Sequence, residues 1–350
     1  MGVVLHLDQA RWRAHLDQVA QVTPGLTPVA KGNGYGFGVA RLASEATRLG
    51  VETLAVGTLA EAPLARAHFT GRILILQPWR PDDPPSHDPG LIRTVSRLED
   101  LARLADQPVA PQVVVELMTS ITRHGIGLAD LNQVPDELEG VELVGWALHL
   151  PLPAARHRRG PAEALELGRA ALAVQSAPVW LSHLSQAEYD QVRAELGDCR
   201  LRLGTRLWLG APESRRVTAS VIDRHPVRRG QRVGYWQHKA PADGHIVVLA
   251  GGTSHGVGLS APSTAATWRR RGQAVAEGLL AAAGRVRSPF TIAGAKRRFV
   301  EPPHMQVSLV FLPSEVPPPA IGDEIPLDLR LTTATLDQIH LTEDDSTTSA

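Results

Sequence analysis

Short apolar runs alternate with amphipathic stretches between residue 26 and about residue 210 of the chain. The first amphipathic stretch, 39–49, repeats apolar residues at helical spacing, and the Gly50 that follows favours the end of a helix. We expect strands over 26–31, 53–58, 72–77, 91–96, 112–118, 143–149, 178–183 and 200–204. We expect helices over 39–49, 59–67, 97–105, 162–174 and 186–196. Near-continuous apolar strands joined by helices are typical of a parallel sheet covered on both faces, and eight of them suggest a (β/α)8 barrel.

The pattern changes after about residue 217, where strand-like alternation replaces the mixed pattern. We expect strands over 218–222, 245–250, 305–312, 325–331 and 337–341, with one helical stretch near 265–283. These strands predict a mainly antiparallel β module, with which Val3 to Asp8 could pair. The expected domains are a barrel over 9–217, a β domain over 1–8 and 218–342, and a disordered tail over 343–350. The segment 78–90 contains five prolines and is expected to be a loop.

The amino-acid composition limits the classes of partner and metal site that we expect for the chain. Acidic and basic residues balance at 36 each, so no overall charge favours nucleic acid or an anionic membrane. The single cysteine, Cys199, excludes an internal disulfide and a multi-cysteine metal cluster, and we expect no metal. No signal peptide and no membrane span are evident, so a cytoplasmic location is expected.

Candidate chemistry begins at Lys31, one of three lysines in a chain with 33 arginines. An amine at the buried end of a strand loses hydration, which lowers its pKa and makes it a better nucleophile or base. Glycines alternate over 32–38, so backbone N–H groups can approach an anion, and Tyr35 adds a hydroxyl. A lysine that can form a Schiff base beside an anion cradle suits pyridoxal 5'-phosphate. The ordinary alternative is a surface lysine before a glycine-rich turn.

The stretch 31–38 resembles the signature of the alanine racemase family, a group of pyridoxal-phosphate enzymes of fold type III. In that signature a lysine precedes alternating small residues with Asn and Tyr-Gly. Here glycine stands at 32 and 34, and Phe37 stands where a histidine is common. The layout of barrel and β domain is also that of the family and supports the count of eight strands. The resemblance implies a pyridoxal-phosphate-binding TIM-type (β/α)8 barrel followed by a mainly antiparallel β domain.

The segment after the fifth strand, 115–127, resembles the family segment that carries a modified lysine and an arginine. Arg123 matches the arginine that binds near the cofactor phenolic oxygen and the substrate carboxylate. Glu116 stands where many members have a carbamylated lysine, so its carboxylate is expected to orient Arg123 without modification. Its apolar neighbours make Glu116 a poor place for an unpaired charge.

The ends of the sixth and seventh strands carry two further matches. His149 matches the family histidine that stacks on the cofactor ring, although a lone histidine on a strand is more often structural. Ser185 is the expected match to the serine that binds phosphate, with Ser182 as the second choice.

The eighth strand carries Arg202, which by resemblance would hydrogen-bond the pyridine nitrogen of the cofactor. A cation there disfavours protonation of the ring, which favours simple proton removal. By the same resemblance, Gly204 and Thr205 would hold the phosphate through backbone N–H groups.

The second catalytic base is the least settled part of the site. Racemisation by two bases needs one on each face of the substrate Cα. The family supplies a tyrosine from the β domain of the partner subunit, and Gly252 stands at that position here. His255 is the substitute available in the same loop, and a structural histidine is an equal alternative. Met305 lies near the family segment that contacts substrate.

The resemblance therefore implies an amino-acid racemase that interconverts L- and D-alanine, or a similar small amino acid, through a Schiff base on Lys31. It implies a homodimer with shared active sites that supplies a D-amino acid as a cell-wall precursor. One alternative is a lyase of the same fold, whose metal would need His and Cys ligands near the C-terminus. The other is a non-catalytic carrier or regulator that binds pyridoxal phosphate, which the missing tyrosine favours.

Overall fold

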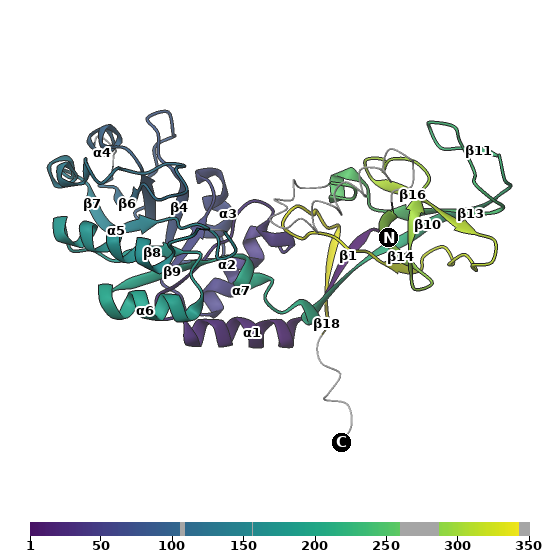
Figure 1. Ribbon diagram of the computed structural model, residues 1–350, viewed down its shortest axis with the longest axis horizontal. Helices are drawn as coiled ribbons and strands as arrows, with labels where there is room; N and C mark the ends of the chain where they lie inside the picture. The colour runs from purple at the N-terminus through teal and green to yellow at the C-terminus, as the bar shows by residue number, and fades with distance from the viewer. Residues whose placement is uncertain (106–108, 156, 260–286, 343–350) are drawn as a thin grey trace, which may run out of the picture. The chain divides into compact units, whose positions relative to one another are not determined.

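The computed structural model describes residues 1–105, 109–155, 157–259 and 287–342. The chain divides into two compact units (Figure 1). Arg13–Gly210 forms one, here called the barrel unit, and Met1–Trp12 with Ala211–Ala350 forms the other, here called the β unit. Among the described residues, no helix has the length and apolar character needed to cross a membrane.

The barrel unit contains eight parallel strands in the order β2-β9-β8-β7-β6-β5-β4-β3. They are β2 (Leu26–Pro28), β3 (Thr53–Val56), β4 (Arg72–Pro78), β5 (Leu91–Val95), β6 (Gln112–Leu117), β7 (Glu142–Leu148), β8 (Val179–Ser182) and β9 (Cys199–Leu203). The ring is closed by a parallel bridge between Val29 and Ala55, where the Ala30 N–H donates to the Ala55 carbonyl at 2.7 Å. The expected (β/α)8 barrel is confirmed, and each strand lies within a few residues of its expected range.

Helices cover the outside of these strands (Figure 1). They are α1 (Gln9–Val22), α2 (Val39–Arg48), α3 (Ala62–Arg66), α4 (Leu98–Leu104), α5 (Pro161–Val174), α6 (Gln186–Leu196) and α7 (Thr205–Trp208). The proline-rich segment 79–90 contains no helix, as expected. Helix α1 was not expected, because few of its apolar positions are buried and Trp12 and Leu16 are the two that are fully so.

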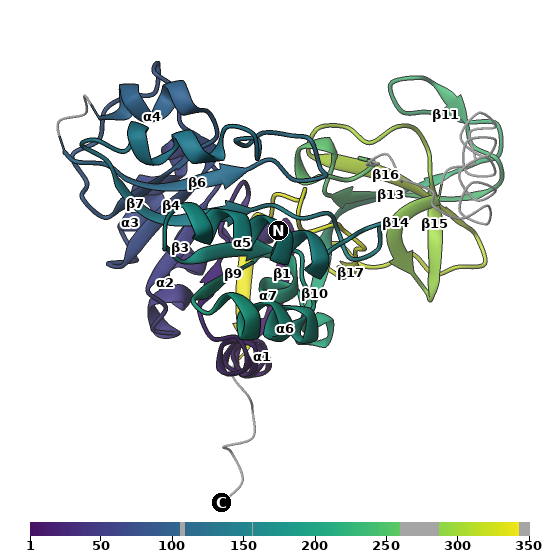
Figure 2. The ribbon, with the colours of Figure 1, turned by 60° about the vertical axis from the view of Figure 1, so that its left-hand side comes forward.

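The β unit is built on a sheet in the order β14-β15-β16-β13-β10-β1-β18, with β17 paired to β10. Its strands are β1 (Val3–Asp8), β10 (Arg215–Val227), β13 (Gly244–Ala250), β14 (Arg287–Ile292), β15 (Ala295–Phe299), β16 (Val307–Pro313), β17 (Glu324–Pro326) and β18 (Gln338–Thr342). Figure 2 shows β13 and β16 side by side. A separate hairpin joins β11 (Arg232–Val233) to β12 (His238–Lys239). Every pair is antiparallel except β1 with β18, so the mainly antiparallel module and its pairing with Val3–Asp8 are confirmed.

Two expectations for the β unit need correction. The strand expected over 325–331 ends at Pro326, and proline has no N–H to continue the ladder. The hairpin of β14 and β15 was not expected, because its turn uses Ala293 and Gly294, both at positive φ, and Ala-Gly is a weak turn signal. The expected helix 265–283 and tail 343–350 lie outside the described residues.

Candidate active site

The interior of the barrel has an apolar layer below a polar layer. The apolar layer takes one buried residue from each of seven strands or their extensions: Val29, Ala55, Leu74, Ile92, Val114, Ala147 and Trp180. Side chains two positions apart on a strand share a face. The residues two positions after five of these apolar residues, at or just past the strand ends, are Lys31, Gly57, Glu116, His149 and Ser182. The chemistry-bearing side chains therefore gather at the C-terminal end of the strands, where barrel enzymes carry their active sites.

Lys31 follows β2 at this end. Its pKa is lowered, first by partial desolvation and then by the positive charges of Arg123 and Arg202, while Glu61 opposes the shift. The side chain itself is exposed, so the amine is accessible to a ligand. An accessible amine with a lowered pKa is suited to act as a nucleophile or base.

Glu61 is a neighbour of Lys31 that the sequence analysis missed. Its Oε1 accepts the Gly32 N–H at 3.0 Å and its Oε2 accepts the Gly57 N–H at 2.7 Å, so one carboxylate joins the loops after β2 and β3. A signal was available, because Glu61 is the one ionisable residue in the stretch 53–61 that contains β3 and its loop.

Tyr35 and Gly204 meet at close range. Tyr35 is buried in the short 3-10 turn η1 (Gly34–Gly36) and has a left-handed backbone, with φ 56°. A Cβ built on Gly204 would lie 1.9 Å from the Tyr35 hydroxyl oxygen, so a side chain there would have to displace the hydroxyl. Burial raises the pKa of Tyr35 to about 12, which keeps the hydroxyl protonated at neutral pH. The hydroxyl therefore lies beside the backbone that begins α7.

Glu116 is the buried anion of the site. Its Oε1 lies 3.9 Å from Arg123 Nη2, a long ion pair, and its Oε2 lies 3.1 Å from His124 Nδ1, a contact that was not expected. The His124 contact lacks hydrogen-bond geometry. Glu116 also favours the charged form of Arg202. The structure thus brings Glu116 and Arg123 together. The Glu116 side chain is 3% exposed and the Arg123 side chain is 50% exposed.

His149 is held by its neighbours on β8. Its Nδ1 lies 3.2 Å from Ser182 Oγ, and its ring stands edge-on to that of His183 at 4.8 Å. Desolvation, followed by the charges of Arg202 and Arg123, lowers the pKa of His149 to about 2. The imidazole is therefore neutral at physiological pH.

Arg202 is buried on β9, and its Nη2 donates to the Leu148 carbonyl at 2.9 Å. Its Nε is buried and has no hydrogen-bond partner among the described residues. Burial lowers the pKa of Arg202, opposed by Glu116. Since buried donors are almost always satisfied, the free Nε is a position where a bound acceptor would be stabilised.

Two of the expected phosphate ligands, Ser185 and Thr205, lie at helix starts. Ser185 caps α6, where its Oγ accepts the Glu188 N–H at 3.3 Å and the Glu188 carboxylate accepts the Ser185 N–H at 2.8 Å. Its hydroxyl oxygen therefore accepts a hydrogen bond from the helix, and its O–H can still donate to an anion. Thr205 is the first residue of α7, directly after Gly204, and is exposed.

His255 and Met305 belong to the β unit. His255 is buried, with 7% of its surface exposed. Its Nδ1 accepts the Gly252 N–H at 3.3 Å, and its Nε2 lies 3.3 Å from the Asp337 carboxylate. With both ring nitrogens engaged, the contacts favour a structural role. Met305 has a 73% exposed side chain, and its carbonyl accepts the Ser254 hydroxyl at 2.6 Å.

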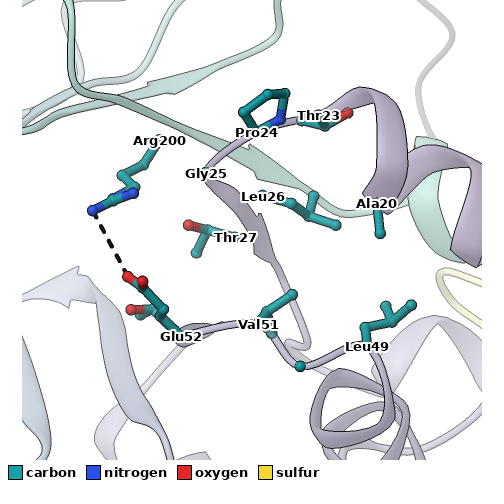
Figure 3. Close-up of a pocket in the computed structure, with 12 residues that line it drawn as sticks. Ala20, Thr23, Pro24, Gly25, Leu26, Thr27, Leu49, Val51, Glu52 and Arg200 are labelled. Carbon is teal, nitrogen blue, oxygen red and sulfur yellow. Dashed lines mark ion pairs between the residues drawn. The ribbon is translucent and has the colours of Figure 1, made fainter.

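A cavity of about 240 Å³ lies at the other end of the barrel strands (Figure 3). Leu26, Thr53 and Arg200, which line it, are at the starts of β2, β3 and β9. Arg200 and Glu52 form a 3.7 Å ion pair across it. Polar groups at this end of a barrel usually serve stability, so the cavity is separate from the candidate site.

The family model for the N-terminal domain of alanine racemase matches residues 7–189, more than half of the chain. The chain belongs to the alanine racemase family. This match confirms the resemblance seen in the signature at Lys31. No curated protein sequence matches the chain.

Solved alanine racemases have a similar fold. The structure from Bartonella henselae, with covalently bound pyridoxal phosphate, is 18% identical, covers 94% of this chain and 90% of its own, and has a TM-score of 0.68. The structure from Acinetobacter baumannii is 15% identical over 97% of this chain and 99% of its own, with a TM-score of 0.67. The structure from Bacillus anthracis, with bound L-Ala-P, is 19% identical over 93% and 85%, with a TM-score of 0.70. At these identities the similarity establishes the fold.

Proposed function

We propose that the chain is a pyridoxal-phosphate-dependent amino-acid racemase that acts on alanine or a similar small amino acid. The observation that carries the proposal is that Lys31 and Arg202 lie near each other at the same end of the barrel. Lys31 offers an accessible amine of lowered pKa, and Arg202 offers a buried donor without a partner in the described residues. Membership of the alanine racemase family supports the same chemistry.

The residues present fit the cofactor. Lys31 would bind its aldehyde carbon, Arg202 Nε would face its pyridine nitrogen, and the Tyr35 hydroxyl with the backbone at Gly204 and Thr205 would hold its phosphate. When bound, pyridoxal phosphate supplies an electron sink that acidifies the Cα–H of an amino acid. The Arg202 guanidinium beside the pyridine nitrogen would disfavour ring protonation, which would weaken the sink and favour simple proton removal.

Lys31 would carry the proton at the substrate Cα. Its lowered pKa keeps more of the amine neutral at a given pH than in an ordinary lysine, so Nζ can accept a proton and return it. The loops that hold it are fixed by Glu61, which accepts N–H groups from both Gly32 and Gly57. This support restricts movement of the amine relative to the substrate.

Arg123 would bind the substrate carboxylate. Its half-exposed guanidinium can form two parallel hydrogen bonds to a carboxylate. Glu116 balances its charge from the buried side at 3.9 Å. His149, neutral because its pKa is about 2, adds no further positive charge to a site that already contains Arg123 and Arg202.

The test is exchange of the substrate Cα proton. The purified protein, supplied with pyridoxal phosphate, is incubated with L- or D-alanine in D2O, and deuterium incorporation and the enantiomer ratio are measured. We expect exchange and interconversion in the native chain, none in Lys31→Ala, and native behaviour in the control Lys239→Ala, which removes an exposed lysine. Release of a carbonyl product would instead indicate a lyase.

A second candidate is a pyridoxal-phosphate carrier or regulator, and position 252 favours it. A Cβ on Gly252 would lie 2.0 Å from the His304 carbonyl oxygen, so the family tyrosine cannot be accommodated there without moving the backbone. Cofactor binding without exchange of either enantiomer would support this function over racemisation.

A further inference from the structure

Three side chains of types that can bind metals meet in the β unit, and none of them is assigned to the candidate site. His6 lies on β1, His340 on β18 and Glu324 on β17. Strands β1 and β18 are parallel neighbours in which His6 stands opposite His340, and Figure 1 shows the two strands side by side. One ligand atom from each residue lies within 4.8 Å of the other two.

The geometry within the cluster is close. His6 Nε2 lies 2.8 Å from Glu324 Oε2, and the rings of His6 and His340 are 5.4 Å apart at 87°. Thr218 Oγ1 donates to Glu324 Oε2 at 3.1 Å and lies 2.9 Å from His6 Nε2. The His6 side chain is 12% exposed and that of Glu324 is 39% exposed. The cluster is therefore partly enclosed and open to solvent on one side.

We propose that His6, Glu324 and His340 bind one divalent transition-metal ion. Two imidazole nitrogens and a carboxylate oxygen are a common three-residue set for Zn²⁺, with water as the fourth ligand. Imidazole ligands suit zinc, copper and nickel, whereas magnesium and calcium prefer all-oxygen sites, so Zn²⁺ is the ion of choice here. Thr218 supplies the outer hydrogen bond that orients the carboxylate.

The two histidines and the glutamate also supply the ligand types of a catalytic-type zinc set without any cysteine. The expectation of no metal rested on the single cysteine and did not weigh histidine and carboxylate ligands.

Arg216 is the competing group. Its Nη1 lies 4.0 Å from Glu324 Oε2, and its side chain is 66% exposed, so it can turn away into solvent. A metal ion bound to Glu324 would be repelled by a guanidinium at that distance. Arg216→Ala should therefore tighten metal binding.

A bound ion would connect β1, the first strand described, to β17 and β18, the last two strands described. Because an ion that binds the folded chain and not the unfolded chain raises stability, Zn²⁺ should raise the melting temperature. This effect does not depend on the cofactor or on racemase activity.

The experiment uses the full-length chain without an affinity tag. Titration with Co²⁺, a spectroscopic substitute for Zn²⁺, is followed by visible absorption, and Zn²⁺ is followed by thermal unfolding. We expect one saturable site per chain and a Zn²⁺-dependent rise in melting temperature. Since loss of an outer partner alone weakens metal binding by about 10–100-fold, Glu324→Gln and His340→Ala should weaken it by at least about tenfold.

The matched control is His225→Ala, which removes an exposed histidine that lies 3.3 Å from Asp223 and belongs to no three-residue group among the described residues. It should bind Co²⁺ as the native chain does. Circular dichroism checks that Glu324→Gln, a near-isosteric change, is folded. Absence of saturable binding to the native chain, or unchanged binding in both Glu324→Gln and His340→Ala, would overturn the proposal.

Discussion

The hydroxyl oxygen of Tyr35 fills the space that a side chain at Gly204 would need, 1.9 Å from where its Cβ would be. The two residues are far apart in sequence, and their contact places the hydroxyl at the backbone that begins α7. Gly204 has a negative φ of −113°, and the close approach of the Tyr35 hydroxyl leaves no space for a side chain there.

Gly204→Ala should therefore displace the Tyr35 hydroxyl and weaken binding of pyridoxal phosphate. Loss of a hydrogen bond to a charged group costs about 1.5–3 kcal/mol, or roughly ten- to hundredfold in Kd. A fluorescence titration with the cofactor measures the change. Gly127→Ala is the control, because its Cβ would meet nothing nearer than 3.8 Å. Tyr35→Phe should show a loss of similar size, and native affinity in both variants would refute the role of the hydroxyl.

The cofactor adduct should form on Lys31. The protein purified with pyridoxal phosphate should be yellow, and borohydride should remove the colour and leave a stable pyridoxyl group on Lys31. Peptide mapping identifies the modified residue, and Lys31→Ala should carry none. A modified Lys239 or Lys296 would show that the assignment is wrong.

The amine of Lys31 should react at lower pH than an ordinary lysine. A lowered pKa means that the neutral, reactive form persists as pH falls below the usual range for lysine. Acylation of the cofactor-free protein over a range of pH, with Lys31 followed by mass spectrometry, gives the titration curve. Arg123→Gln removes one of the two guanidinium charges and should move that curve to higher pH. A Lys31 curve that coincides with that of a model lysine peptide would contradict the prediction.

Glu116→Gln should impair substrate binding more than cofactor binding. The change keeps the shape of a 3% exposed side chain but removes the charge that faces Arg123. We expect KM to rise by roughly tenfold or more, as for loss of a charged hydrogen-bond partner, and activity of the native chain to be independent of bicarbonate. The exposed Glu142→Gln serves as control. Unchanged kinetics in Glu116→Gln would exclude the orienting role.

His255→Ala separates a base from a structural histidine. Removal of a general base costs about 10²–10⁴-fold, and would suppress Cα exchange of one alanine enantiomer while Lys31 still exchanges the other. Because both ring nitrogens of His255 are engaged, we expect an unchanged exchange pattern and a lower melting temperature. Selective loss of one enantiomer's exchange would instead identify His255 as the second base.

Much of the barrel could be predicted because each strand is a short apolar run with a clear end. The same ends located Lys31, Glu116, His149 and Arg202, since reactive residues in barrels follow their strands. Glu61 was missed because its role depends on two backbone N–H groups that only the folded loops bring together.

The cluster of His6, Glu324 and His340 shows a second limit of prediction from sequence. His6 and His340 meet only because the first and last described strands pair in parallel, and no local pattern in sequence reports that register. Ser185 stays a predicted phosphate ligand, because the hydroxyl that accepts the Glu188 N–H at the start of α6 can still donate a hydrogen bond.

The strand pairing that closes the barrel has a consequence for folding. The segment before Lys31 is hydrogen-bonded on both sides, through Val29 N–H to the Leu203 carbonyl and Ala30 N–H to the Ala55 carbonyl. The pairing with β9 joins segments about as distant in sequence as the barrel unit allows, and such contacts form slowly because loop closure must precede them. The amine of Lys31 therefore reaches its final position when the first strand of the barrel pairs with the last. A partly folded chain would hold Lys31 without Arg123 and Arg202 in position, so their lowering of the Lys31 pKa would arise only when the ring is closed.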